Sequence, residues 1–138
     1  MLLATAGCGG SDSESLTADA YRDRANAICK GLNDANEKAF KDIDTDDQPA
    51  LIRATEDIGK RTAKALEDLD ALEGPAESEA AIDRILATGK ALGEVNTRRT
   101  TALASGDKDV VDQTLAEVSR LTEQAATAAR GPGLDDCA

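Results

Sequence analysis

The chain has 138 residues, a length typical of one domain, and its 27 acidic against 16 basic residues give a formal net charge of −11. This charge excludes a basic surface for nucleic acid, and the absence of His and Trp excludes Ser-His-Asp and Cys-His catalytic sets, imidazole zinc sites and tryptophan stacking platforms. Leu, Ile, Val and Phe make up only 25 residues, but 26 alanines and a regular apolar spacing favour helices over a disordered chain. We therefore expect a helical protein with no catalytic set, metal site, cofactor or nucleic-acid partner.

The first residues are typical of a lipoprotein signal. The run T-A-G-C at 5–8 resembles a bacterial lipobox, in which small residues precede the cysteine that takes the diacylglycerol. Seven residues precede Cys8, whereas a secretory signal has a basic segment and about 7 to 15 apolar residues. We expect residues 1–7 to be the end of a lipoprotein signal, Cys8 to be the lipidation site and residues 8–16 to be a flexible tether. The alternative is an unprocessed N-terminus of a cytosolic protein.

Two helices are expected next. Thr17 is a suitable N-cap, flanked by a hydrophobic staple between Leu16 and Tyr21, and the acidic run at 42–47 ends the first helix. Its apolar seam is Tyr21, Ala25, Ile28, Leu32, Ala35 and Ala39. Pro49 lies in the first turn of the second helix, which Gly74-Pro75 ends. The seam of this helix is Leu51, Thr55, Ile58, Thr62, Ala65, Leu69 and Leu72.

The third helix is expected from about residue 76 to Ser105, with Glu77 and Glu79 in its first turn. Its seam is Ile82, Ile85, Gly89, Leu92, Asn96, Arg99 and Leu103. Gly106 suits a left-handed position after the helix, and Asp107 caps a fourth helix that ends at Gly131-Pro132. The fourth seam is Val111, Leu115, Val118, Leu121, Ala125 and Ala128. Four helices joined by short turns predict an all-α, up-down-up-down antiparallel bundle over residues 17–138, without strands.

Three cysteines are present, at positions 8, 29 and 137. With Cys8 set aside for lipid, the other two can form one disulfide or remain reduced thiols. The stretch Y-R-D-R-A-N-A-I-C at 21–29, the S-G-D junction at 105–107 and the ending G-L-D-D-C at 133–137 resemble a set of small actinobacterial exported proteins and lipoproteins. The resemblance implies an extracytoplasmic helical domain in which Cys29 is bridged to Cys137, and it implies no assigned activity. The bridge is within reach, because the tail must climb about 18 Å along the first helix and seven extended residues span at most about 25 Å.

Two further groups of residues are candidates for binding. Asp42, Asp44 and Asp46 match the first ligand positions of a calcium loop, but Asp47 and Arg53 stand where Gly and Glu are required, so a solvated turn is expected. The second group lies within the third helix and consists of Gly89, Gly93, Asn96, Arg98 and Arg99. Either a neighbouring helix packs closely on the glycines, with the arginines paired to surface acids, or the group forms a groove with a cationic and amide lip. Such a groove suits a small anion or a partner's carboxylate.

These observations predict a non-enzymatic interaction or structural module of the cell envelope. We expect a lipid anchor at the extracytoplasmic face of the cell membrane, or secretion if the lipobox is not used, and another envelope protein as partner. The alternative is a bundle that carries a small ligand or an anion. An enzyme that uses only carboxylates is not expected, because no convergent pair of acids can be identified.

Overall fold

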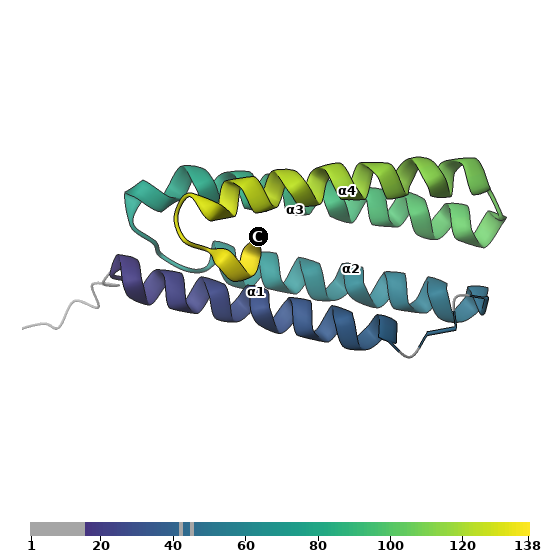
Figure 1. Ribbon diagram of the computed structural model, residues 1–138, viewed down its shortest axis with the longest axis horizontal. Helices are drawn as coiled ribbons and strands as arrows, with labels where there is room; N and C mark the ends of the chain where they lie inside the picture. The colour runs from purple at the N-terminus through teal and green to yellow at the C-terminus, as the bar shows by residue number, and fades with distance from the viewer. Residues whose placement is uncertain (1–15, 42, 45) are drawn as a thin grey trace, which may run out of the picture.

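The computed structural model describes residues 16–41, 43–44 and 46–138 and shows four helices in antiparallel succession (Figure 1). The helices are α1 (Ala18–Lys41), α2 (Gln48–Asp70), α3 (Ala76–Ser105) and α4 (Lys108–Arg130), and a short 3-10 helix η1 (Asp135–Cys137) follows them. The described part of the chain contains no strand. The expected all-α, up-down-up-down bundle is confirmed.

Side chains cap the N-termini of α1, α2 and α4, and a glycine ends α3. The Thr17 hydroxyl accepts a hydrogen bond from the Ala20 amide at 3.3 Å, and the Asp47 carboxylate accepts one from the Ala50 amide at 3.0 Å. After α3, Gly106 takes a left-handed conformation with φ 74°, and the Asp107 carboxylate caps α4 by accepting from the Val110 amide at 3.1 Å. The roles of Thr17, Gly106 and Asp107 agree with the prediction, whereas the cap at Asp47 was not predicted. All of these side-chain caps join residues three positions apart.

The largest apolar core lies at the end of the bundle where α1 begins and α4 ends. All four helices and the C-terminal tail contribute to it, through Tyr21, Ala25, Cys29, Leu69, Ile82, Ile85, Ala129 and Leu134. The loop between α2 and α3 closes this end, because a Cβ at Gly74 would lie 2.6 Å from Cε2 of Tyr21. Glycine at position 74 therefore allows the loop to pack directly on the tyrosine ring.

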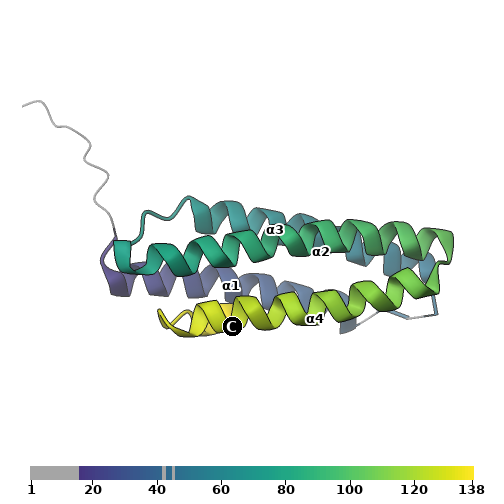
Figure 2. The same ribbon diagram turned by 90° about the horizontal axis from the view of Figure 1, so that it is seen from above.

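The buried lines of α3 and α4 differ from the expected seams. Beyond Gly89, α3 buries Val95 and Ala102, whereas Leu92, Asn96, Arg99 and Leu103 are only half-buried. The reason is that α3 lies between α2 and α4 and therefore has two buried strips, of which the expected seam follows only one (Figure 2). On α4 the buried residues are Thr114, Leu121, Ala126 and Ala129, and Leu115 of the expected seam is 42% exposed.

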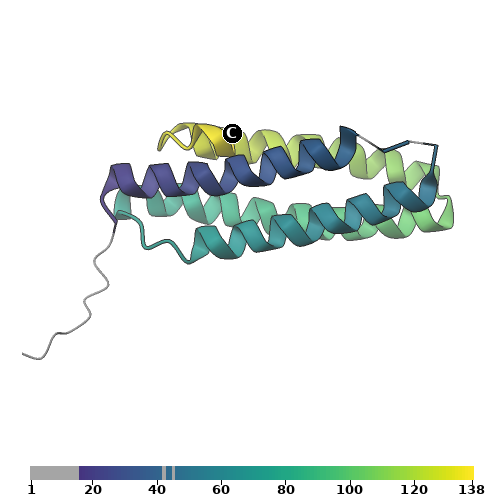
Figure 3. The same ribbon diagram turned by 90° about the horizontal axis from the view of Figure 1, so that it is seen from below.

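The C-terminal tail lies between α1 and α4 (Figure 1). The Cα atoms of these two helices stay more than 8 Å apart, whereas η1 contacts both of them. Leu134, a residue of the tail, is completely buried. The expected bridge between Cys29 and Cys137 is confirmed, with 5.0 Å between their Cα atoms. Among the helices, only α2 has Cα atoms within 8 Å of those of α1 in the described part of the chain, and Figure 3 shows it beside α1. The side chains of α1 meet those of α3 and α4 in the core.

Two asparagines of α1 hold the backbone of the tail. The Asn26 amide group donates to the Gly133 carbonyl at 3.2 Å, and its oxygen accepts from the Asp136 amide at 3.1 Å. About two turns further along α1, Asn33 donates to the Asp136 carbonyl at 2.8 Å. The tail is thus fixed by side chains as well as by the disulfide.

Candidate functional site

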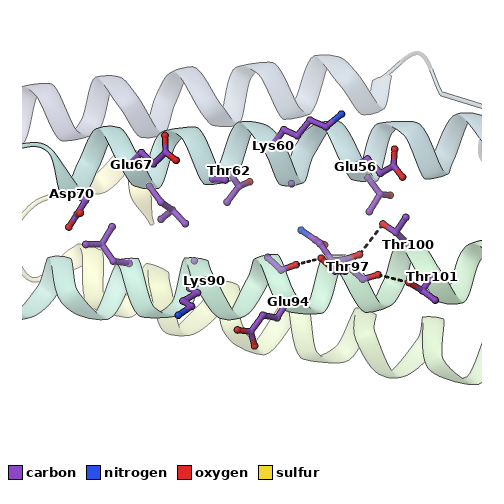
Figure 4. A pocket seen from close by; sticks show the side chains of 18 residues that line it. Glu56, Lys60, Thr62, Glu67, Asp70, Lys90, Glu94, Thr97, Thr100 and Thr101 are labelled. Atoms are coloured by element: carbon purple, nitrogen blue, oxygen red, sulfur yellow. Dashed lines mark hydrogen bonds between the residues drawn. The ribbon is translucent and has the colours of Figure 1, made fainter.

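An open groove of about 1220 Å³ runs between α2 and α3, and Figure 4 shows the side chains that line it. It extends along α2 from Thr55 to Asp70 and along α3 from Leu86 to Thr101. Three of the five residues that the sequence singled out line this groove, namely Gly89, Gly93 and Asn96.

The glycines of the groove have different surroundings. A Cβ at Gly89 would lie 2.5 Å from Cδ2 of Leu66, so this glycine allows the Leu66 side chain of α2 to pack on the backbone of α3. A Cβ at Gly93 or at Gly59 would meet nothing within 4 Å. Close packing of a neighbouring helix therefore accounts for Gly89, whereas Gly93 and Gly59 leave open space in opposite walls of the groove.

The threonines of the α3 wall use their hydroxyl protons within the helix. Thr97 donates to the Gly93 carbonyl at 3.0 Å, Thr100 to the Asn96 carbonyl at 3.0 Å and Thr101 to the Thr97 carbonyl at 3.1 Å, as the dashed lines in Figure 4 mark. A threonine bonded in this way keeps an acceptor oxygen and a methyl group for a ligand, but no free proton. These three threonines therefore add methyl groups and hydrogen-bond acceptors to the wall.

The charged side chains around the groove are mainly acidic. The carboxylates are Glu56, Glu67, Asp70 and Glu94, and the ammonium groups are those of Lys60 and Lys90. Lys60 forms an ion pair with Asp57 at 3.4 Å, whereas no ion pair within 4.0 Å joins any of the four carboxylates to a cation of the described residues. The groove thus carries a net negative charge along its edges. Figure 4 shows that Asp70 points toward α3, whereas Glu56 and Glu67 point away from α3 and Glu94 points away from α2.

The two arginines expected at the lip lie elsewhere. Arg98 forms an ion pair with Glu117 of α4, and Arg99 is half-buried with its Nε fully covered and without a hydrogen-bond partner. Burial lowers the pKa of Arg99 from its ordinary value, but the group keeps its charge at neutral pH. Neither arginine lines the groove, so the cationic lip that the sequence suggested is not formed. The physical reason is that these positions of α3 face away from α2.

No residue of α2 was predicted from the sequence to line a binding groove. Glu56, Gly59, Lys60 and Glu67 all line the groove, and none of them belongs to the expected seam of that helix. Gly59 was the available signal, because glycine in a helix interior costs about 1 kcal/mol relative to alanine and often has a packing or functional reason. Pairing it with Gly93 required knowledge of how α2 lies against α3.

A second, smaller hollow of about 610 Å³ lies between α3 and α4. Its charged lining residues are Arg84, Arg120 and Glu123, and Gln124 and two threonines add polar groups. Neither arginine has a carboxylate within 4.0 Å among the residues that the structure describes. This hollow is therefore the positively charged one of the two.

The remaining expected sites have simple outcomes. Cys8, and with it the expected lipidation site, lies outside the described residues, as do the tether up to residue 15 and Asp42. Among the described residues no three Cys, Asp or Glu side chains come together as a metal-binding group. None of the described helices is long and apolar enough to cross a membrane.

Comparisons of the chain with protein-family models, with curated proteins and with solved structures found no match.

Proposed function

We propose that the protein is a lipid-anchored, non-enzymatic interaction module on the extracytoplasmic face of the cell membrane. The observation that carries the proposal is the disulfide between Cys29 and Cys137. Disulfides persist in oxidising compartments outside the cytoplasm and are rare within it. The pairing also leaves Cys8 as the one cysteine available for lipid, which agrees with the lipobox-like run before it.

The composition of the α2/α3 groove supports binding rather than catalysis. No Ser, Cys or Tyr is among its lining residues, and the chain has no histidine to act as a base. The hydroxyl protons of Thr97, Thr100 and Thr101 are donated to helix carbonyls, so these groups are not activated nucleophiles. An open groove with unpaired carboxylates is suited to holding a partner.

The test is the fate of Cys8. We expect the protein in the cells that make it to be cleaved before Cys8, to carry an acyl modification by mass spectrometry and to fractionate with the membrane. Cys8→Ala should move it to the soluble extracytoplasmic fraction, because one covalent lipid is its anchor. Ser11→Ala is the control, since it changes a nearby residue and leaves both Cys8 and the disulfide between Cys29 and Cys137 intact. A cytosolic protein with an unmodified Met1 contradicts the proposal.

The carrier alternative is favoured by one observation, the pair of unpaired guanidinium groups in the α3/α4 hollow. Two arginines with an amide beside them are suited to a phosphate or carboxylate group. Calorimetric titration with inorganic phosphate tests this alternative, and loss of binding in Arg84→Gln and Arg120→Gln but not in Arg24→Gln would support it. Absence of phosphate binding contradicts an anion carrier of this kind.

A further inference from the structure

The groove between α2 and α3 has the dimensions of a helix-binding site. Along α2 its carboxylates extend from Glu56 to Asp70, a distance of about 21 Å at a rise of 1.5 Å per residue. Its volume of about 1220 Å³ exceeds the roughly 300 to 1000 Å³ of small-molecule pockets, and it is open along its length. A helix of about 14 residues has the same length.

The walls of the groove allow the backbone of such a helix to approach closely. Gly59 on α2 and Gly93 on α3 both leave the space of a side chain unoccupied, with nothing within 4 Å of the Cβ position. Ala63, Leu66 and Leu86 add apolar surface. Small residues in facing walls are the feature that lets helices pack at short interaxial distances.

The charges of the groove define the chemistry of its occupant. Four carboxylates without ion pairs lie along its edges, three of them pointing outward where the flanks of a docked helix would lie (Figure 4), whereas one of its two ammonium groups is already paired with Asp57. The back-bonded threonines add acceptors but no donors. A donor-rich, positively charged ligand is therefore complementary, and an anionic one is repelled.

We propose that this groove docks a basic amphipathic helix of a partner protein, with small and aliphatic residues on the face toward α2 and α3 and with Lys or Arg on its flanks. The flanking cations pair with Glu56, Glu67, Asp70 and Glu94. The inference rests on the proposed function as an interaction module and names the partner's chemistry, as in other helix-in-groove interfaces.

The first experiment is site-specific photo-crosslinking in intact cells that make the protein. A photoreactive amino acid replaces Ala63, which is exposed and lines the groove, and in a matched variant it replaces Ala27, which is exposed on α1 outside the groove. We expect a product from position 63 only, in which mass spectrometry maps the crosslink to a basic amphipathic helical segment of another protein. No product, equal products from both positions, or a crosslink to an acidic or non-helical segment overturns the proposal.

The second experiment uses the mapped segment as a synthetic peptide with the full oxidised chain carrying Cys8→Ser. Gly93→Leu and Gly59→Leu fill the groove, whereas Gly31→Leu adds the same side chain at an exposed position of α1 that is equally free of neighbours within 4 Å. We expect affinity at least tenfold weaker in the first two variants and unchanged in the third, by calorimetry, with circular dichroism confirming that all are folded. Equal affinities of Gly93→Leu and Gly31→Leu overturn the proposal.

The third experiment tests the role of the carboxylates with substitutions that remove charge and do not enlarge the side chains. The groove variant combines Glu56→Gln, Glu67→Gln, Asp70→Asn and Glu94→Gln, and its control neutralises four exposed acids that do not line the groove, Asp23, Glu37, Asp83 and Asp112. Peptide binding should weaken at least tenfold and lose most of its salt dependence in the groove variant only, because both variants have the same net charge. Similar loss in both variants overturns the proposal. A cytosolic location of the protein would refute the anchor while leaving these affinities unchanged, so the two proposals fail separately.

Discussion

Gly89 and Gly93 lie one turn apart on α3 and serve different purposes. The first is covered by Leu66 of α2, whereas the second has no neighbour within 4 Å of its Cβ position. Both are in a helix interior, where glycine costs about 1 kcal/mol relative to alanine. Close packing explains this cost at position 89, and the open groove is the feature that explains it at position 93.

We expect Gly93→Ala to raise the free energy of unfolding by about 1 kcal/mol, because it improves helix propensity without a clash. Gly89→Ala should instead cost about 1 to 3 kcal/mol, because the added methyl group displaces Leu66. Urea unfolding followed by circular dichroism measures both changes. In a Leu66→Ala background the penalty at position 89 should largely disappear, and a penalty that persists there contradicts the assignment of the clash.

Tyr21 makes a second prediction at this scale. Burial raises the pKa of Tyr21 above its ordinary value of 10.0. The unfolded chain therefore loses the phenol proton at lower pH than the folded protein. The stability that depends on a protonated Tyr21 is fully present below pH 10.0, and it is lost as the pH rises through the pKa of the folded protein. As the chain has one tyrosine, the near-ultraviolet absorbance of tyrosinate reports this group alone.

We expect the tyrosinate titration to have a midpoint above 10.0 in the folded protein and to return to the ordinary value in concentrated urea. In Tyr21→Phe the free energy of unfolding should no longer show the decrease at alkaline pH that deprotonation of Tyr21 causes. The same midpoint with and without urea would show that the phenol is hydrated in the folded protein.

Among the elements, α1 depends most on the tail. Its Cα atoms come within 8 Å of those of α2 and η1, but not of those of α3 or α4. The tail fills this gap with Leu134 and is held there by Asn26, which both donates to it and accepts from it. An unusual feature of this bundle is therefore that a terminal segment takes the place of close packing between its first and last helices.

We expect Asn26→Ala to lower the free energy of unfolding by about 1 to 3 kcal/mol, because the tail amide and carbonyl lose their partners in a partly buried position. Hydrogen exchange should be accelerated at the Asp136 amide, which donates to Asn26. Asn33→Ala is the control, since it removes one exposed hydrogen bond and should cost less. Unchanged exchange at Asp136 in Asn26→Ala contradicts this role.

At the scale of the whole molecule, covalent closure compensates for a core with few large side chains. Alanines, one tyrosine and a few leucines and isoleucines form the main cluster, and the disulfide joins residues 108 positions apart. In the chain-entropy description a loop of this length contributes about 4 to 5 kcal/mol by restricting the unfolded chain. This is a large part of the roughly 5 to 15 kcal/mol that stabilises a domain.

We expect Cys137→Ser to lower the melting temperature markedly while leaving the helical circular-dichroism spectrum at low temperature almost unchanged, since the bridge acts mainly on the unfolded chain. Reduction of the wild-type protein should have the same effect, and Cys8→Ser should have none. An unchanged melting temperature after reduction contradicts the stabilising role of the bridge.

The sequence by itself determined the helices and their ends. Thr17, Gly106 and Asp107 act on backbone groups within a few residues, so their roles are readable without the fold. The cap at Asp47 is equally local, although it was not predicted. The pairing of Cys29 with Cys137 was implied by a resemblance and was within reach of the tail, and the structure confirms it.

Tertiary structure alone decided which side of each helix is covered. An apolar period identifies a stripe but not the neighbour that buries it, so Leu115 was expected inside and is exposed, while Val95 and Ala102 were overlooked and are buried. The groove has the same origin. Gly89 and Gly93 of its α3 wall were singled out from the sequence. The position of Gly59 opposite them, the acidic edges of the groove and the absence of Arg98 and Arg99 from it depend on how α2, α3 and α4 pack together. Residues distant in sequence meet only in the folded chain.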